Sequence, residues 1–537
     1  MANPPAHGSP PVLYTNANVV TLDPAQPQAA AILIEGDRIK QVYARPPAER
    51  PAAAVVIDLE GATVVPGLVD AHLHLDGMGS KQRQIDLVGT ASEAEVLARV
   101  RSHLQANPGS APVIGFGWDQ NDWQRQEYPA RANLDAVAGS RPVVLYRIDG
   151  HAAWLSTAAL ALGGVGRETK EPAGGRILRL ADGEPSGILV DQAIELVTGR
   201  LPAPSREQLE NDYAAAAARC AALGLTAVHD MGMTRAGLEA LRALERRSAL
   251  PIRVFAYQVV EGDHTIDQLP ASGVRRSVGL IEVRGIKLYA DGALGSRGAA
   301  LLQPYSDDPG NSGLLVTEPK LLTELVRRVD RRRHQVAIHA IGDRGNQVAI
   351  EALAALGRGA SQRRHRIEHA QVLAARDIAA FGRLGIVASM QPTHATSDMP
   401  WAEARLGKKR LAGAYAWRPL LDAGAHLAFG SDAPVESADP RWGLFAAVYR
   451  TDHRGQPAGG WWPEHRLDRR SALEAFTVGA AFAVQREDEL GRIKPGFLAD
   501  LTVLDRDPLA DSVDLLALKV RRTIVGGREV VGPRAAE

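Results

Sequence analysis

Short apolar segments alternate with longer helical stretches through the middle of the chain. This alternation is typical of repeated β–α units, which build a parallel sheet. The predicted strands are residues 68–75, 226–230, 253–260, 283–290, 336–341, 366–371, 386–390 and 427–431. A helix between the first two strands has clear end signals, with Ser205 as N-cap, Gln208 three residues later and a stop at Gly224. Eight strands with seven or eight helices predict a (β/α)8, TIM-like barrel.

Both ends of the chain are rich in short strands. The N-terminal candidates are residues 12–14, 18–22, 31–39 and 55–58, and the C-terminal ones are 500–504 and 520–531. Gly and Asp residues interrupt them as in hairpins. We therefore expect one small β-sandwich domain built from residues 1–66 plus 485–537, with the barrel occupying residues 67–484.

A long segment, residues 77–204, separates the first two barrel strands. It is too long for a plain connection, so it is expected to be an inserted subdomain. The segment leaves the barrel directly after His74, at the end of the first strand, where a cover over an active site would be attached. Its three tryptophans, Trp118, Trp123 and Trp154, and Tyr146 fit the wall of a substrate pocket. The alternative is a peripheral packing or oligomerisation domain.

Composition excludes several classes of protein. The 537 residues are 45% hydrophobic and 23% charged, which is ordinary globular composition. Lys+Arg and Asp+Glu both number 62, so the basic excess typical of nucleic-acid binding is missing. The single cysteine, Cys220, excludes an internal disulfide or a cysteine-based metal cluster. No run approaches the roughly 20 apolar residues of a membrane span, and no secretory signal is recognisable, which predicts a cytoplasmic protein.

Polar residues with metal-binding chemistry follow several predicted strands. They are His72 and His74 on the first strand, Lys287 on the fourth, His339 on the fifth, His369 on the sixth and Asp432 after the eighth. Alternation along a strand places both histidines of the first strand on one face. Because catalytic groups of such barrels gather at the carboxyl ends of the strands, these six residues are expected to converge on one site.

Each of these residues alone also fits a structural role, such as a buried histidine or a helix cap. Lys287 is the most informative, because a lysine between Ile286 and Leu288 in a strand places a charge in the interior, at a cost of several kcal/mol if it is unpaired. Only nine of the 62 Lys and Arg residues are lysine. An interior lysine in such a chain indicates a need for amine chemistry at that position.

The strand-end segments carry a family resemblance. Residues 65–74 (VPGLVDAHLH) resemble the opening motif of the amidohydrolase superfamily, and residues 287–296, 338–343, 366–369 and 430–435 resemble amidohydrolase family 3, which includes N-substituted formamide deformylases. Residues 491–496 and 499–501 resemble the return into the small β domain. The resemblance covers nearly the whole chain.

The resemblance implies a two-metal centre. His72 and His74 would bind the more buried ion, and His339 and His369 the outer one. Lys287, carboxylated by CO2, would bridge both ions, while Asp432 would bind the buried ion and transfer protons. Imidazoles and carboxylate oxygens favour zinc, with manganese or iron as alternatives. A carbamate would also turn the buried cation into an anionic ligand.

Further residues are candidates for substrate binding. They are His151, Trp118 and Trp154 in the insertion, His229 on the second strand, and Asp291 and Arg297 after the lysine strand. His151 lies in a segment, residues 146–151, that also resembles family 3. A structural role is the alternative for each, and Asp291 and Arg297 could equally belong to a loop ion pair.

The function expected from these features is metal-dependent hydrolysis of a C–N bond in a small-molecule amide or N-formyl compound. A metal-activated hydroxide would attack the carbonyl carbon, and Asp432 would pass its proton to the leaving amine. The first alternative is hydrolysis of an ester or lactone at the same centre. The second is a non-catalytic binding or assembly barrel, against which the full set of six ligands argues. Neither a nucleic-acid nor a membrane partner is expected, and a homo-oligomer is left open.

Overall fold

Eight parallel strands, neighbouring in chain order, form the central barrel of the computed structural model, which describes residues 10–532 except 50, 263, 275, 278 and 358. They are β8 (Leu68–Leu73), β15 (Leu225–Met233), β16 (Arg253–Gln258), β17 (Ile281–Tyr289), β18 (Gln335–Ala340), β19 (Arg366–His369), β20 (Val387–Met390) and β21 (His426–Phe429). A parallel bridge between Leu73 and Ala433 joins the last turn of the barrel to the first strand. All eight predicted strands are confirmed.

Six of the barrel strands end one or two residues earlier than predicted, and at three of them the backbone conformation shows why. The first stops at Leu73 because His74 is the N-cap of α1 (Leu75–Ser80). After the sixth, His369 and Ala370 adopt φ values of 70° and 44°, which break the extended conformation. Asp432, three residues after the eighth, has a φ of 60°. Such left-handed conformations of non-glycine residues cluster at functional sites.

Helices surround the barrel. The predicted helix is α6 (Arg206–Ala222), where Ser205 and Gln208 form a capping box, so that prediction is confirmed. The others are α7 (Arg235–Arg246), α8 (Pro319–Arg331), α9 (Asp343–Ala354), α10 (Gly359–Arg363), α11 (Ala375–Leu384), α12 (Pro392–Asp398), α13 (Ala402–Leu406), α14 (Lys408–Leu411), α15 (Trp417–Asp422), α16 (Pro440–Tyr449), α17 (Arg469–Ala475) and α18 (Val478–Ala483). Every residue of β18 is buried, as expected for a parallel strand enclosed on both faces.

Strands from both ends of the chain build the small β domain. One sheet has the order β5-β4-β1-β6 and the other β24-β23-β22-β7-β2-β3. Their bounds are β1 (Val12–Thr15), β2 (Asn18–Val20), β3 (Gln28–Ala29), β4 (Ala31–Glu35), β5 (Arg38–Tyr43), β6 (Val55–Asp58), β7 (Thr63–Pro66), β22 (Leu501–Leu504), β23 (Val520–Val525) and β24 (Arg528–Val531). β22 pairs antiparallel with β7, and Val64 and Leu501 share one hydrophobic cluster. The predicted strand at residues 31–39 is a hairpin, because the chain turns at Gly36.

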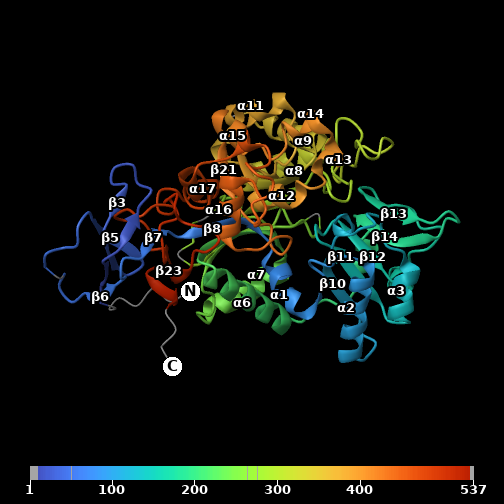
Figure 1. Cartoon of the computed structure of the whole chain (residues 1–537), viewed down its shortest axis with the longest axis horizontal. Helices are drawn as coiled ribbons and strands as arrows, with labels where there is room; N and C mark the ends of the chain where they lie inside the picture. The colour runs from blue at the N-terminus through green and yellow to red at the C-terminus, as the bar shows by residue number, and fades with distance from the viewer. Residues whose placement is uncertain are drawn as a thin grey trace.

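The insertion has its own sheet and core. Its sheet has the order β13-β14-β12-β11-β10-β9. The elements are β9 (Ile85–Asp86), α2 (Glu93–Ala106), β10 (Val113–Trp118), α3 (Arg131–Ala138), β11 (Val143–Arg147), β12 (Ala152–Leu155), α4 (Thr157–Gly163), β13 (Gly175–Arg179), β14 (Pro185–Asp191) and α5 (Glu195–Thr198). Figure 1 shows this subdomain on the right of the barrel, with the small β domain on the left.

Trp118 and Trp154 lie in the core of the insertion. Both are fully buried, their rings are 6.5 Å apart, and the Trp118 indole N–H donates to the carbonyl of Leu145. The prediction that they line a substrate pocket is therefore wrong. For Trp118, the direction of the side chain follows from a register shift between Phe116 and Trp118, at Gly117 with its φ of 112°. Without this bulge, alternation would place the rings of Phe116 and Trp118 on the same face of the sheet.

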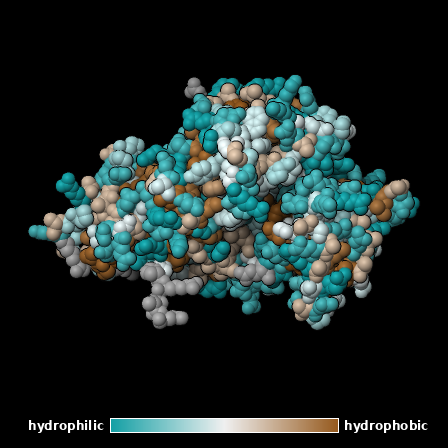
Figure 2. All heavy atoms as spheres, viewed as in Figure 1, coloured by the Kyte–Doolittle hydropathy of each residue, from teal (hydrophilic) through white to brown (hydrophobic). Residues whose placement is uncertain are grey.

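The face of the molecule seen in Figure 2 is mainly polar. Figure 2 shows hydrophilic residues over most of one face, with hydrophobic residues scattered among them. Among the described residues, no helix has the length and hydrophobicity needed to span a membrane.

Candidate metal centre

The six predicted ligand residues meet at the carboxyl end of the barrel. The carboxylate of Asp432 lies 3.3 Å from His72 Nε2 and 3.1 Å from His74 Nε2. Lys287 Nζ lies 3.4 Å from the same His72 nitrogen. The rings of His369 and His72 are 4.8 Å apart, and those of His369 and His339 are 4.6 Å apart. The strand-end rule therefore placed all six correctly in space.

A second layer of side chains orients the histidines. His72 Nδ1 lies 2.6 Å from Glu368, and His369 Nδ1 lies 2.8 Å from the Gln391 side-chain oxygen. With Nδ1 engaged in each ring, Nε2 is left for a metal ion, an arrangement common around metal-bound histidines. Burial raises the pKa of Glu368, but the Arg366 guanidinium and His72 outweigh it and hold that pKa far below its usual range.

Burial favours the neutral form of three of the four imidazoles at the centre, whereas for His74 burial is outweighed by the Asp432 carboxylate, which raises the pKa. Burial lowers the pKa of His72, and it lowers those of His339 and His369 well below the usual value, helped by the positive charge of Lys287. Burial also lowers the pKa of Lys287 to about 8. His72, His369 and Asp432 offer ligand atoms that all lie within 4.8 Å of one another. Neutral imidazoles beside a carboxylate are the donors that zinc and related divalent ions prefer, so the residues present fit a metal ion.

The centre lies at the base of a cavity of about 600 Å³. Barrel residues and insertion residues both line it. The insertion contributes Phe116, Asp119, Asp122, Tyr146, Arg147, Ile148, Asp149, Gly150 and His151. Of the aromatic residues that the sequence suggested for a pocket wall, Tyr146 lines this cavity. The inserted subdomain thus forms part of the cavity wall.

His151 is a predicted substrate-binding residue that the structure does bring to the centre. Its ring lies 5.0 Å from that of His339, and its Nδ1 lies 2.6 Å from an oxygen of Asp191. Burial lowers the pKa of His151, but the hydrogen bond and charge of Asp191 outweigh this and raise it to about 9.

The three remaining predicted substrate residues do not line the cavity. His229 is buried inside the barrel, where its Nδ1 contacts the Arg366 guanidinium at 2.9 Å. Burial and that positive charge lower the pKa of His229 well below its usual value. His229 therefore lies beside Arg366 in the barrel interior, and the prediction that it binds substrate is wrong.

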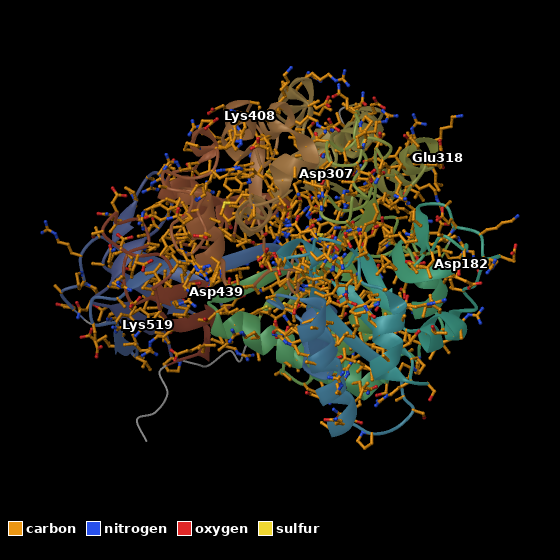
Figure 3. The ribbon with its side chains drawn as sticks, turned by 45° about the vertical axis from the view of Figure 1, so that its right-hand side comes forward. Asp182, Asp307, Glu318, Lys408, Asp439 and Lys519 are labelled. Atoms are coloured by element: carbon orange, nitrogen blue, oxygen red, sulfur yellow. The ribbon has the colours of Figure 1, made fainter. Side chains whose placement is uncertain are left out.

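Asp291 and Arg297 hold loops in place. Asp291 is fully buried and accepts hydrogen bonds from the backbone N–H groups of Ile341, Gly342 and Ala300. Arg297 pairs with Asp307 at 3.0 Å rather than with Asp291. Asp307 is labelled in Figure 3, nearer the middle of the molecule than Asp182 at the outer edge of the insertion. Asp291 and Arg297 therefore have structural roles in these loops, and the prediction that they bind substrate is wrong.

Sequence reasoning missed His394, which lines the cavity from α12. Its ring is stacked with that of His369 at 5.9 Å. Its Nε2 is buried, has no hydrogen-bond partner among the described residues and lies 3.8 Å from Asp432. The signal was present, because His394 lies four residues after the seventh predicted strand. The rule that selected the other strand ends also applies there.

Comparison with known proteins agrees with this geometry. A model of the amidohydrolase family matches residues 55–531. YtcJ of Bacillus subtilis, named as an amidohydrolase, is 34% identical over 497 residues, which cover 92% of each chain. The N-substituted formamide deformylase of Arthrobacter pascens is 29% identical, covering 96% of this chain and 97% of its own.

A solved structure extends the comparison. The crystal structure of an uncharacterized metal-dependent hydrolase from Pyrococcus horikoshii superposes with a TM-score of 0.76 at 30% identity. It covers 94% of this chain and 99% of its own. Family match, relatives and shared fold together support a hydrolase. The chain belongs to the amidohydrolase family.

Proposed function

We propose that the protein is a metal-dependent hydrolase that cleaves the C–N bond of an amide or N-formyl compound. The observation that carries the proposal is the convergence of six side chains, five of which line one cavity: His72, His74, Lys287, His339, His369 and Asp432. The 29% identity to a protein named N-substituted formamide deformylase supports a C–N bond as the target.

The same six residues would hold two divalent ions, with zinc as the first choice. Four imidazoles and the Asp432 carboxylate supply neutral and anionic donors. Lys287 completes the set as a carbamate: its amine is buried, its pKa of about 8 leaves part of it unprotonated near neutral pH, and only the unprotonated amine reacts with CO2. When bound, the ions supply Lewis acidity and a strong nucleophile from water near neutral pH.

Asp432 is placed to move the proton. Its carboxylate contacts His72 and His74 at 3.3 and 3.1 Å, and it also lines the cavity. In the proposed reaction it accepts the proton of the attacking water and delivers it to the leaving nitrogen. The left-handed conformation at Asp432, with a φ of 60°, fixes the carboxylate over the centre.

The experiment combines metal analysis with turnover. Protein loaded with Zn²⁺ or Mn²⁺ is assayed on 4-nitrophenyl esters and on 4-nitroanilides, including 4-nitroformanilide. We expect anilide hydrolysis that is lost on prolonged chelation and restored by either ion. Full activity in a sample verified as metal-free would contradict the metal mechanism. If esters or lactones are hydrolysed and no amide is, the protein is an ester or lactone hydrolase that uses the same centre.

A further inference from the structure

His151 and Asp191 form a cross-strand pair at the end of the insertion's sheet that faces the barrel. β12 and β14 run antiparallel with Ala152 opposite Val190, and the Asp191 N–H donates to the His151 carbonyl at 3.0 Å. Asp191 has a φ of 51°, a conformation that a residue with a Cβ rarely adopts. Such strain persists only where the surrounding structure fixes it, and it is common at functional sites.

The pair leaves one imidazole nitrogen free for a ligand. His151 Nδ1 is held by Asp191 at 2.6 Å. His151 Nε2 has no hydrogen bond to any described residue, yet the side chain keeps 20% of its surface exposed and lines the cavity. The ring lies 5.0 Å from that of His339, so His151 is beside the candidate metal centre.

The barrel makes room for Asp191 at two glycines. A Cβ on Gly292 would lie 2.6 Å from the Asp191 carboxylate, and one on Gly298 would lie 2.8 Å from it. Both glycines follow β17, the strand that carries Lys287. The Gly292 carbonyl is also 3.3 Å from His339 Nε2. The loop that receives Asp191 therefore also touches a histidine of the centre, which fixes the insertion's pair relative to it.

We propose that His151 is a catalytic residue supplied by the insertion, whose Nε2–H hydrogen-bonds the carbonyl oxygen of the substrate, and that Asp191 is its positioning residue. This inference rests on the proposed function. Both ring nitrogens are protonated in this arrangement, with Nδ1–H donating to the Asp191 carboxylate 2.6 Å away and Nε2–H donating to the substrate, so the ring is an imidazolium. No covalent bond to His151 is made or broken. A fixed donor at a carbonyl oxygen strengthens as negative charge develops there, so it accelerates the reaction more than it tightens substrate binding.

The test uses the full-length, zinc-loaded protein and the variants His151→Ala, Asp191→Asn and His103→Ala. His103 is a matched control, a histidine of the insertion helix α2 that does not line the cavity. For each, we measure zinc content, Tm, kcat and KM on 4-nitroformanilide, and the Kd of methylphosphonate. Methylphosphonate imitates the tetrahedral transition state and binds whether or not the chosen substrate is turned over.

In His151→Ala we expect kcat to fall by about 10²–10³, the scale of losing one oxyanion donor, with KM changed only a few-fold. The Kd of methylphosphonate should rise at least about tenfold, in line with the lost stabilisation of the transition state. Asp191→Asn should fall between this variant and the parent, losing about 10- to 100-fold in kcat, because the amide still accepts from Nδ1 but carries no charge. His103→Ala should match the parent.

Unchanged kcat and methylphosphonate affinity in His151→Ala would overturn the inference. So would a loss of zinc or of fold in both cavity variants, because that result makes the pair a structural contact. Failure of the proposed function would give a different result, because the parent protein would bind zinc but hydrolyse no amide. The Kd of methylphosphonate would still show whether His151 contacts the ligand.

Discussion

At the scale of single residues, Lys287 links the electrostatics of the interior to the proposed chemistry. Burial disfavours the ammonium form of Lys287, as its pKa of about 8 reflects. A carbamate at Nζ would replace that charge with oxygen ligands. Lys287→Ala should therefore reduce metal content and lower kcat more than about 100-fold, beyond the usual effect of losing a group outside the metal's direct ligands.

Two companion measurements make the Lys287 prediction specific. Acetate or propionate should partly restore metal binding and rate in Lys287→Ala by filling the bridging position. Lys287→Arg should fail as the alanine variant does, because a guanidinium stays protonated and is not carboxylated. A Lys287→Arg enzyme with normal turnover would rule out the carbamate.

Asp432 is the second residue with a separable role. In Asp432→Asn the amide oxygen still coordinates weakly, so the fold and much of the metal should be retained. The amide does not accept a proton, so kcat should fall by about 10²–10⁴, the scale of losing a general acid or base. Metal analysis alongside steady-state kinetics checks this. A decrease below tenfold at the pH optimum would move proton transfer to another group, with His151 and His394 as the nearest candidates.

The convergence of the six candidate residues was predictable because one rule, that functional groups gather at the carboxyl ends of parallel strands, acts on strands that the sequence marks clearly. The same rule applies to His394, which lies four residues after the seventh predicted strand. The direction of the Trp118 side chain could not be predicted, because it depends on the bulge at Gly117, and the alternation of side chains along a strand does not show where a bulge occurs. The ion-pair partner of Arg297 could not be predicted either, because Asp307 lies in a loop whose path depends on tertiary packing.

At the scale of elements, β10 shows how the insertion divides its aromatic residues. Phe116 lines the cavity, while Trp118, two residues later, packs in the insertion's core. Substrate preference should therefore follow Phe116. Phe116→Ala should change the ratio of kcat/KM between bulky and small anilides by about 10-fold or more, the scale of one altered hydrophobic contact, with metal content unaltered.

A matched control is Phe482→Ala, because that ring packs on His426 and Arg364, outside the cavity. Trp118→Ala should instead lower the free energy of unfolding by about 3–5 kcal/mol, as expected for a deleted core tryptophan. If Phe116→Ala and the parent share one preference across the panel, specificity must come from the barrel loops that carry Trp401 and Glu436.

At the scale of the whole molecule, a buried ion pair attaches the small β domain to the barrel. Arg253 on β16 contacts both oxygens of Asp500 at 2.6 and 3.1 Å, and both side chains are buried. Removing one partner of such a pair leaves the other charge uncompensated. The pair joins residues 247 positions apart in the sequence, so no local pattern predicts it.

Arg253→Met should lower the free energy of unfolding by about 3–5 kcal/mol, measured by urea denaturation of the metal-free protein. Lys40→Ala is the control, because Lys40 pairs with Glu35 on the surface of the same small domain, where loss of a pair costs about 0–1 kcal/mol. Two equal effects would show that the buried pair does not hold the domain to the barrel.

Metal binding should stabilise the whole chain, because the six candidate ligands come from β8 and the start of α1, from β17, β18 and β19, and from the loop after β21. The unfolded chain does not bring these residues together, so binding energy adds to folding energy. At a free zinc concentration 1,000 times Kd, the linkage is worth about 4 kcal/mol. Chelation should lower Tm by several degrees, and the shift should shrink in Lys287→Ala, whose centre binds metal less tightly. A Tm unaffected by chelation, in protein shown to contain zinc beforehand, would place the metal outside the barrel's folded core.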